Sequence, residues 1–320
     1  MISVIVPTLN ESRSIRDCLT ALRAQSIAAD DFEIVIVDNG SRDDTVEIAR
    51  EFSDRVYSFP GVTVGALRNQ GAKLARGEVL AFIDADCVAS RTWLEGASAA
   101  LAEGGVAVGN KYDRPDDRRW IEALWLGAAV QGRVATEELW SGNLVVRRAE
   151  FLASGGFDET LVSYEDVALS RALGKRGPLY MDGRVRVVHT GGPKSLLEFA
   201  RQQLWHGFEE WTLFRRGIKR DTFVPTVACI AGYGLILLSL FFASPARLAL
   251  AAAGALLVLG ATAWRLARHL RSFDRPGFRT VLRLGVLNVV SLTSKAAAVV
   301  IRACGLHWSG RRKTVAVASV

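Results

Sequence analysis

The first 190 residues alternate short apolar runs with longer segments in which apolar residues recur at every third or fourth position. The runs are rich in β-branched residues and too short for helices, which is typical of strands buried in a parallel sheet. They are Ser3 to Val6, Glu33 to Val37, Val79 to Ile83 and Val106 to Gly109. The intervening segments place one apolar stripe along a helix, as at Ile15, Cys18, Leu19 and Leu22. This alternation predicts a doubly wound α/β domain.

The pattern changes after about residue 192. Residues 195–214 mix aromatic and charged side chains at helical spacing, which predicts an amphipathic helix at a membrane surface; a core helix of the α/β domain is the alternative interpretation. The uncharged stretches Phe223 to Ala243 and Leu248 to Trp264 follow, joined by a short hairpin. Each is close to the roughly 17 to 25 residues that span a bilayer.

A third apolar segment, Leu284 to Ile301, is interrupted by Asn288 and Lys295. Its pattern leaves open whether it spans the membrane, re-enters it or lies on the surface. We therefore expect four parts: an α/β catalytic domain at 1–192, an amphipathic interface helix and linker at 193–222, a helical membrane region at 223–304, and a basic tail at 305–320. Within the membrane region, the spans are expected at about 223–243 and 247–264, and the third segment at about 282–304.

Charge is divided unevenly along the chain. The net charge of +7 combines −6 over residues 1–200 with +13 over residues 201–320. The basic residues flank apolar runs, which argues for a membrane and against nucleic acid. The positive-inside rule places residues 215–220 and 265–279 on one cytosolic face, as two spans require, whereas a third span would export the basic residues at 311–313.

The four cysteines are scattered, without C-x-x-C spacing, and the first residues lack the basic region of a signal peptide. The sequence therefore predicts a multi-pass protein of the cytoplasmic (inner) membrane. Its catalytic domain should face the cytosol and keep its thiols free.

Polar loops follow three of the predicted strands, where parallel α/β sheets form their ligand sites. The loops are Pro7 to Glu11, Asp38 to Asp44 and Asp84 to Asp86. The spacing of Asp84 and Asp86 lets both carboxylates face one Mg²⁺ or Mn²⁺ ion that substrate phosphates complete. The alternative is a capped turn at a helix start.

Together with this D-x-D, six further motifs occur in order over roughly residues 2–190. They are VIVPTLNE from Val4, IVIVDNGS from Ile34, RNQGA from Arg68, SGNLVVRR from Ser141, GGFDE from Gly155 and YEDVAL from Tyr164. The set resembles glycosyltransferase family 2, the inverting nucleotide-sugar transferases with the GT-A fold, a Rossmann-like domain whose sheet is mostly parallel.

The resemblance implies a role for each motif. The nucleoside would be held by Pro7, Thr8, Asn10, Glu11 and Asp38. Arg68 would lie beside the base or the phosphates, and Asp84 and Asp86 would hold the diphosphate and the metal. Asp166 would be the catalytic base, with Glu165 beside it.

The chemistry of inversion agrees with these roles, because it needs one base for the acceptor hydroxyl and electrostatic stabilisation of the departing diphosphate. Repulsion between the adjacent carboxylates of Glu165 and Asp166 would raise one pKa on partial burial; a solvated, acid-capped helix start is the alternative.

Four further positions are candidates for the sugar, the acceptor or the metal. Gly142 and Asn143 are expected beside the sugar, or else in a turn before a strand. His189 is a possible third metal ligand, or a hydrogen-bonded structural residue. Gln203 and Trp205 resemble, imperfectly, the Q-x-x-R-W segment of processive members; since the arginine is missing, we expect single addition.

The sequence thus predicts a membrane-anchored enzyme that transfers one sugar from a nucleotide-sugar donor to a lipid-linked or other glycan acceptor, in envelope polysaccharide or glycolipid assembly. A UDP-sugar is the default by analogy with the family. One alternative is a polyprenyl-phosphate sugar synthase, whose acceptor is already anionic. The other is a non-catalytic membrane scaffold that binds nucleotide sugar.

Overall fold

The structure, a computed structural model, describes residues 1–113, 120–215, 217, 223–273 and 275–305. The described chain forms two compact units. The first comprises residues 1–113 and 128–192, and the second comprises residues 120–127 and 193–305. The predicted basic tail, apart from its first residue, lies outside the described residues, as does most of the basic linker at 216–222.

The first unit is built on an eight-stranded sheet in the order β3-β2-β1-β4-β8-β6-β9-β7. Its strands are β1 (Ile2–Thr8), β2 (Phe32–Asp38), β3 (Val56–Ser58), β4 (Val79–Ile83), β6 (Ala107–Gly109), β7 (Arg133–Thr136), β8 (Asn143–Arg147) and β9 (Leu179–Asp182). β1 to β4 pair in parallel, and β8 enters antiparallel between β4 and β6. The four predicted strands and the α/β fold class are confirmed.

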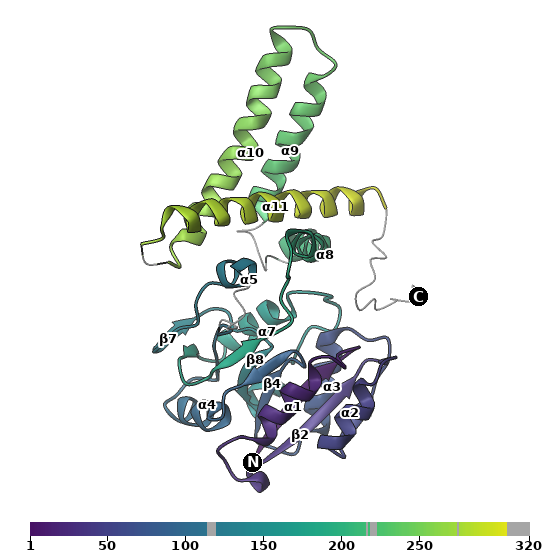
Figure 1. Cartoon of the computed structure of the whole chain (residues 1–320), viewed down its shortest axis with the longest axis vertical. Helices are drawn as coiled ribbons and strands as arrows, with labels where there is room; N and C mark the ends of the chain where they lie inside the picture. Colours follow the sequence, from purple (N-terminus) through teal and green to yellow (C-terminus); the bar gives the residue numbers. More distant parts are fainter. Residues whose placement is uncertain (114–119, 216, 218–222, 274, 306–320) are drawn as a thin grey trace. The chain divides into compact units, whose positions relative to one another are not determined.

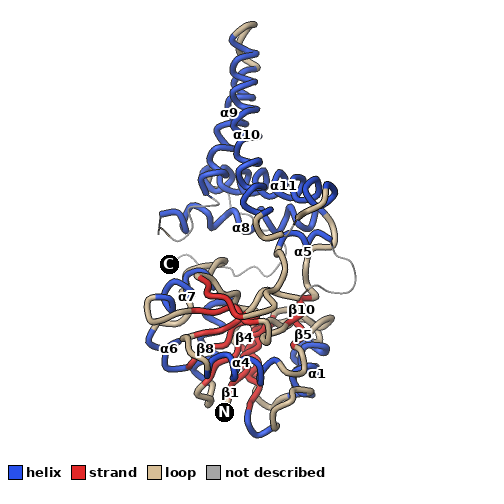
Figure 2. The backbone as a smooth tube through the Cα atoms, turned by 90° about the vertical axis from the view of Figure 1, so that its left-hand side faces the viewer, coloured by secondary structure: helices blue, strands red, loops and turns tan. Residues whose placement is uncertain are grey.

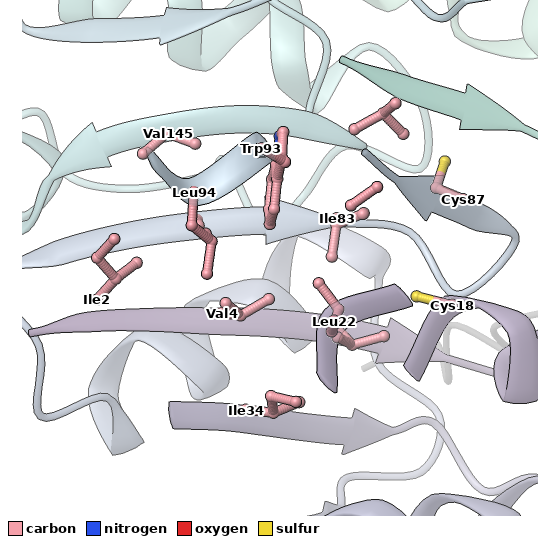
Figure 3. Packing of buried hydrophobic residues seen from close by; sticks show 14 of the residues in the cluster. Ile2, Val4, Cys18, Leu22, Ile34, Ile83, Cys87, Trp93, Leu94 and Val145 are labelled. Atoms are coloured by element: carbon pink, nitrogen blue, oxygen red, sulfur yellow. The ribbon is translucent and has the colours of Figure 1, made fainter. Parts of the chain in front are cut away.

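Helices cover both faces of this sheet. They are α1 (Ile15–Arg23), α2 (Thr45–Phe52), α3 (Val64–Leu74), α4 (Trp93–Ala102), α6 (Arg148–Ala153) and α7 (Glu165–Gly174), with a short 3₁₀ turn η1 (Ala29–Asp31). Because side chains alternate along a strand, Val4 packs in one core with Leu22 and Trp93 (Figure 3), whereas Ile5 packs in the opposite core.

The carboxyl ends of the parallel strands meet at one edge of the sheet. Thr8 at the end of β1 lies opposite Asp38 at the end of β2, and Asp84 directly follows β4. β8 starts at Asn143 opposite Ile83, which brings the preceding residue, Gly142, to the same edge. A two-stranded ribbon of β5 (Cys87–Ala89) and β10 (Val187–His189) follows the D-x-D.

The second unit is helical. It contains α5 (Trp120–Trp125), α8 (Leu196–Arg215), α9 (Phe223–Ser239), α10 (Ala246–Leu270) and α11 (Phe278–Ala303). α9 and α10 form a hairpin, and α11 and α8 both cross the direction of that hairpin at its base (Figures 1 and 2). α10 and α11 are long and apolar enough to cross a membrane, while α9, at 17 residues, is shorter.

The segment that contains α5 is an insertion between β6 and β7. The structure groups it with the C-terminal helices, because Trp125 packs against Phe199 and accepts a hydrogen bond from His269 at 2.9 Å on its carbonyl. The predicted division at residue 192 did not include this insertion. Sequence reasoning had no signal for it, since six residues are too few for a clear periodicity.

Candidate active site

Arg68 lies at the centre of the acidic motifs. This α3 residue is 3% exposed, and its guanidinium donates to Asp84 Oδ1 at 2.6 Å and to Glu165 Oε1 at 2.7 Å. The ring of Phe157 lies 5.4 Å from the guanidinium carbon. Burial alone would lower the pKa of Arg68, but the two carboxylates raise it above its ordinary value, so the cation is retained.

This arrangement separates the two members of each acidic pair. Arg68 binds the first acid of the D-x-D and the first acid of the Glu165-Asp166 pair. Glu165 is buried and also accepts from Ser141 Oγ at 3.3 Å. The Arg68 guanidinium is thus bound between two carboxylates, and its expected place beside the base or the phosphates stays a prediction. The Glu165 carboxylate is bound by Arg68 and Ser141, and its expected place beside the catalytic base also stays a prediction.

The second acid of each pair is held differently. Asp166 lies in the first turn of α7, where its Oδ1 accepts from the Val167 backbone N–H at 2.8 Å. Tyr164, just before the helix, adopts a left-handed φ of 63°, which sets the sharp entry into α7. This hydrogen bond holds the half-buried carboxylate of Asp166 in a fixed position at the start of α7, as a base requires.

Asp86 and His189 form a candidate metal site. Their Oδ2 and Nε2 atoms lie 3.4 Å apart, and Cys87 completes a group whose ligand atoms lie within 4.8 Å of one another. The pairing of β5 with β10 places His189 directly opposite Cys87. Burial raises the pKa of the Cys87 thiol well above its ordinary value, so carboxylate and imidazole are the better donors. This donor set fits Mn²⁺ or Mg²⁺ completed by substrate phosphates.

Tyr112 and Gly142 shape the space between the two sites. The Tyr112 ring stacks on His189 at 4.9 Å and 18°. A Cβ at Gly142 would lie 2.2 Å from the Tyr112 hydroxyl and 2.5 Å from Asp84 Oδ2, so only glycine fits there. Sequence reasoning missed Tyr112. Its position could have identified it, because Tyr112 lies three residues after the strand that ends at Gly109. The predicted polar loops likewise follow strand ends, where such sheets form their ligand sites.

The two loops predicted to hold the nucleoside brace each other. Asp38 is 2% exposed, and its Oδ2 accepts from the Gly40 and Ser41 backbone N–H groups at 2.8 and 2.9 Å. Asn10, in a left-handed conformation, accepts from the Arg42 N–H at 2.9 Å. In the same first loop, Pro7 and Thr8 are buried at the end of β1, while the Glu11 N–H donates to Thr45 Oγ1 at 2.8 Å. The structure therefore brings these residues together, with Asp38 shaping the turn.

Three residues predicted at the sugar or acceptor make contacts within the protein. Asn143 is fully buried; its Oδ1 accepts from Trp93 Nε1 at 2.9 Å, and its Nδ2 donates to two backbone carbonyls. Gln203 is buried between α8 and α11, where it accepts from Ser291 Oγ at 2.8 Å. Trp205, also on α8, is 37% exposed and packs on His206. The amides of Asn143 and Gln203 are thus bonded within their own units, and their expected roles at the sugar or acceptor stay predictions.

Asn69 extends the network to the GGFDE motif. Its Nδ2 donates to the Phe157 carbonyl and to Glu159 Oε1, both at 2.9 Å, and its Oδ1 accepts from the Phe157 N–H at 3.0 Å. Gly156, with φ of 72°, leaves room for this amide, since a Cβ there would lie 2.8 Å from Asn69 Oδ1. Neighbouring residues of α3 thus fix three of the motifs.

Comparison with known proteins shows which family part of the chain matches. Residues 3–144 match the family described as Glycosyl transferase family 2. The chain is 38% identical over 112 residues to "Glycosyltransferase AglE" of Haloferax volcanii, covering 33% of this chain and 36% of that protein. It is 28% identical over 219 residues to "Validoxylamine A glucosyltransferase" of Streptomyces hygroscopicus subsp. jinggangensis, covering 55% and 52%.

The fold has neighbours among solved structures. The mannosyltransferase PcManGT of Pyrobaculum calidifontis, solved with GDP-Man and Mn²⁺, superposes with a TM-score of 0.60 at 18% identity, covering 96% of this chain and 88% of that one. Residues 1–349 of S. aureus TarS superpose with a TM-score of 0.50 at 19% identity, covering 96% and 92%. The chain spans about a third to a half of the curated relatives that it matches.

Proposed function

We propose that this chain, which carries a glycosyl transferase family 2 domain, transfers one sugar from a nucleotide-sugar donor to a membrane-associated acceptor with inversion at the anomeric carbon. The observation that supports this most is the Arg68 network. It braces the first acid of both acidic pairs and leaves Asp86 beside His189 and Asp166 at the start of α7.

Each residue has a separate task in the proposed reaction. Asp166 takes the proton from the acceptor hydroxyl as its oxygen attacks the anomeric carbon, and the bond from that carbon to the diphosphate breaks. Arg68 holds Asp84 and Glu165 in place, so the charges around the site are ordered before the reaction. Gly142 leaves open the space beside Asp84.

Asp86 and His189 would hold the divalent cation. When bound, the cation supplies positive charge to the departing diphosphate. The site's own contribution is to fix both ligands: Thr190 donates twice to the Asp86 carbonyl at 2.8 Å, and Tyr112 stacks on the His189 ring. Mg²⁺ and Mn²⁺ both suit this site, and the Mn²⁺ in the mannosyltransferase neighbour makes Mn²⁺ the first ion to test.

The acceptor is proposed to be lipid-linked or close to a membrane. The support is the pair of long apolar helices α10 and α11, with the apolar α9, in the same chain as the transferase domain. The catalytic domain would then face the cytosol, on the side of the basic residues at 265–279. UDP-sugars and GDP-sugars both deserve testing, the first by family analogy and the second because the neighbour was solved with GDP-Man.

A ligand-binding experiment tests the donor and metal together. The full chain in detergent is heated with UDP-sugars or GDP-sugars, with and without Mn²⁺. A ligand that binds the folded state stabilises it by about 2.7 kcal/mol at a hundredfold excess over Kd. The melting temperature therefore rises. Asp86→Asn and His189→Ala should abolish the metal-dependent part of the shift, while the exposed Asp17→Asn should keep it.

Turnover is then measured as transfer of labelled sugar to a membrane extract. We expect EDTA to abolish transfer and Mn²⁺ to restore it. A metal-dependent donor shift without any transfer would favour the scaffold alternative. A full shift and full activity in EDTA would exclude the proposed metal site.

A further inference from the structure

α11 has the length and hydropathy of a membrane-crossing helix, but three of its polar residues, Asn288, Ser291 and Lys295, are buried on one face. Ser291 Oγ donates to Gln203 Oε1 at 2.8 Å, and Lys295 Nζ donates to Glu210 Oε1 at 2.5 Å. The side chains of the ion pair are 3% and 1% exposed. These contacts attach α11 to α8 along its buried polar face.

The attachment is close and continues to the end of α11. A Cβ at Gly207 of α8 would lie 2.7 Å from Ala298 Cβ and 2.8 Å from Lys295 Cα, so the two helices meet nearly backbone to backbone. Arg302 donates to the Phe208 carbonyl and lies 3.3 Å from Glu209. α11 therefore cannot enter a membrane without α8.

α8 is too polar to enter hydrocarbon. Its 20 residues include five charged side chains, Glu198, Arg201, Glu209, Glu210 and Arg215. Arg201 is exposed and therefore would have to be desolvated in lipid. Because charged groups at the bilayer centre are strongly disfavoured, α8 must remain at the membrane–water boundary, and α11 with it.

The outward face of α11 is largely apolar, although the exposed Thr293, which bonds Tyr233, is polar. Its exposed large apolar residues are Phe278, Leu282, Val286, Val289 and Val300, at intervals of 4, 4, 3 and 11 residues. In a helix of 3.6 residues per turn these positions fall on one side, roughly opposite Ser291 and Lys295. An exposed apolar face opposite a polar one is typical of a helix that lies in the membrane interface.

The position of the α11 contact along α10 indicates how deep α11 would lie in a membrane. Arg247 and Arg265 enclose 17 uncharged residues, a length of about 26 Å at the usual helical rise, close to the hydrocarbon thickness. α11 packs against α10 at Val258 and Ala261, through Leu292 and Ala296. That contact lies four to seven residues from Arg265, or about 6 to 10 Å, which matches the depth of an interfacial helix.

We propose that α9 and α10 cross the membrane as a hairpin, whereas α11 does not cross and lies in the leaflet nearest Arg265, covering α8 on its membrane side. Figures 1 and 2 agree with this, since α11 crosses the direction of the hairpin in both views. The inference rests on the proposed membrane anchoring but not on any transferase activity. Both ends of the α9–α11 segment would then lie on the same side of the membrane.

Cys304 offers a native probe of the inference. It directly follows α11 and is exposed, while the other three cysteines are buried. The full chain is expressed in cells and treated with a membrane-impermeant maleimide, either in intact cells or in inverted membrane vesicles. Two control variants in a Cys304→Ser background serve as references for the two sides of the membrane. Ser272→Cys lies in the α10–α11 loop, and Ser244→Cys lies at the tip of the α9–α10 hairpin.

We expect Cys304 to label from the same side as the Ser272→Cys variant, and the Ser244→Cys variant to label only from the opposite side. Labelling of Cys304 from the Ser244→Cys side would show that α11 crosses, and would overturn the proposal. Labelling of all three from one side would show that the hairpin does not cross, and would overturn it as well. Neither result depends on sugar transfer, so a failure here leaves the proposed reaction to be judged by its own assay.

Discussion

At the scale of single residues, the most informative side chain is Arg68. It donates one hydrogen bond to the first acid of each acidic pair, so it fixes the positions of Asp84 and Glu165. An arginine suits this task because its planar guanidinium presents several N–H donors in a fixed fork, which a lysine ammonium lacks. In the proposed reaction Asp84 and Glu165 are positioned by Arg68, and Asp86 and Asp166 are the candidates for contact with metal and acceptor.

We expect Arg68→Gln to destabilise the protein and to abolish metal-dependent donor binding. Removing one partner of a buried ion pair leaves an uncompensated charge and costs about 3 to 5 kcal/mol; the partial exposure of Asp84 places the loss near the lower figure. The measurement is the melting temperature with and without donor and Mn²⁺. Arg13→Gln, on an exposed side chain, is the control. A variant as stable as the parent would contradict the bracing role.

Gly142→Ala should damage activity more than stability. The new methyl group would lie against the Tyr112 hydroxyl and Asp84, and displacing catalytic groups by about 1 Å can cost about 10² in rate. Gly132→Ala is the matched control, because nothing lies within 4 Å of a Cβ at that position. The values of kcat/KM for transfer are compared. Equal activity of the two variants would show that the space beside Asp84 is unused.

At the scale of elements, the sequence predicted strands and helices wherever buried residues follow a regular pattern within a short segment. The runs at Ser3 to Val6 and Val79 to Ile83 could only be buried strands, and the strand-end rule located the D-x-D correctly. The sequence could not show that the Asn143 amide bonds Trp93 or that Gln203 bonds Ser291 of α11. Each of these hydrogen bonds depends on a partner distant in sequence. The third apolar segment stayed ambiguous for the same reason.

The turn after β9 provides a prediction on pH. Hydrogen bonds from Arg184, aided by nearby Arg133, lower the pKa of Asp182, a side chain 3% exposed. A carboxyl with a lowered folded-state pKa stabilises the fold fully above its unfolded pKa of about 3.9, and this contribution disappears as the pH falls through the folded value.

Asp182→Asn should therefore melt at a lower temperature than the parent at pH 7, and the difference should shrink below about pH 4. Melting temperatures between pH 3 and 7 provide the measurement, with the exposed Asp17→Asn as the control. A difference that stays constant down to pH 3 would show that the Asp182 charge adds nothing.

The α9–α10 hairpin depends on two facing glycines. A Cβ at Gly254 would lie 2.5 Å from the Gly232 carbonyl oxygen, whereas a Cβ at Gly260 on the same helix would meet nothing within 4 Å. Gly254→Ala should therefore cost about 1 to 3 kcal/mol through overpacking. Gly260→Ala should be neutral or slightly stabilising, because alanine favours helix. Thermal unfolding in detergent compares them, and equal melting temperatures would exclude the close contact.

At the scale of the whole molecule, the chain passes between its two units more than once. It enters the second unit for residues 120–127, returns for the rest of the sheet, and leaves again after residue 192. A chain ending at residue 192 would deprive α5 of Phe199, His269 and Arg265, all of which contact Trp125. We therefore expect α5 to keep its packing only in the full chain, although the sequence motifs lie within residues 2–190.

Asp166 has the central role in the proposed reaction, where it would deprotonate the acceptor during an inverting sugar transfer. The most direct measurement compares kcat and the nucleotide-sugar Kd of the parent, Asp166→Asn and the control Asp17→Asn. Loss of a positioned base should lower kcat by about 10² to 10⁴ while Kd stays nearly unchanged. Retained kcat in Asp166→Asn would contradict the claim and point to an acceptor that is already anionic, such as a lipid phosphate. A parallel loss of donor binding would instead make Asp166 a donor-site residue.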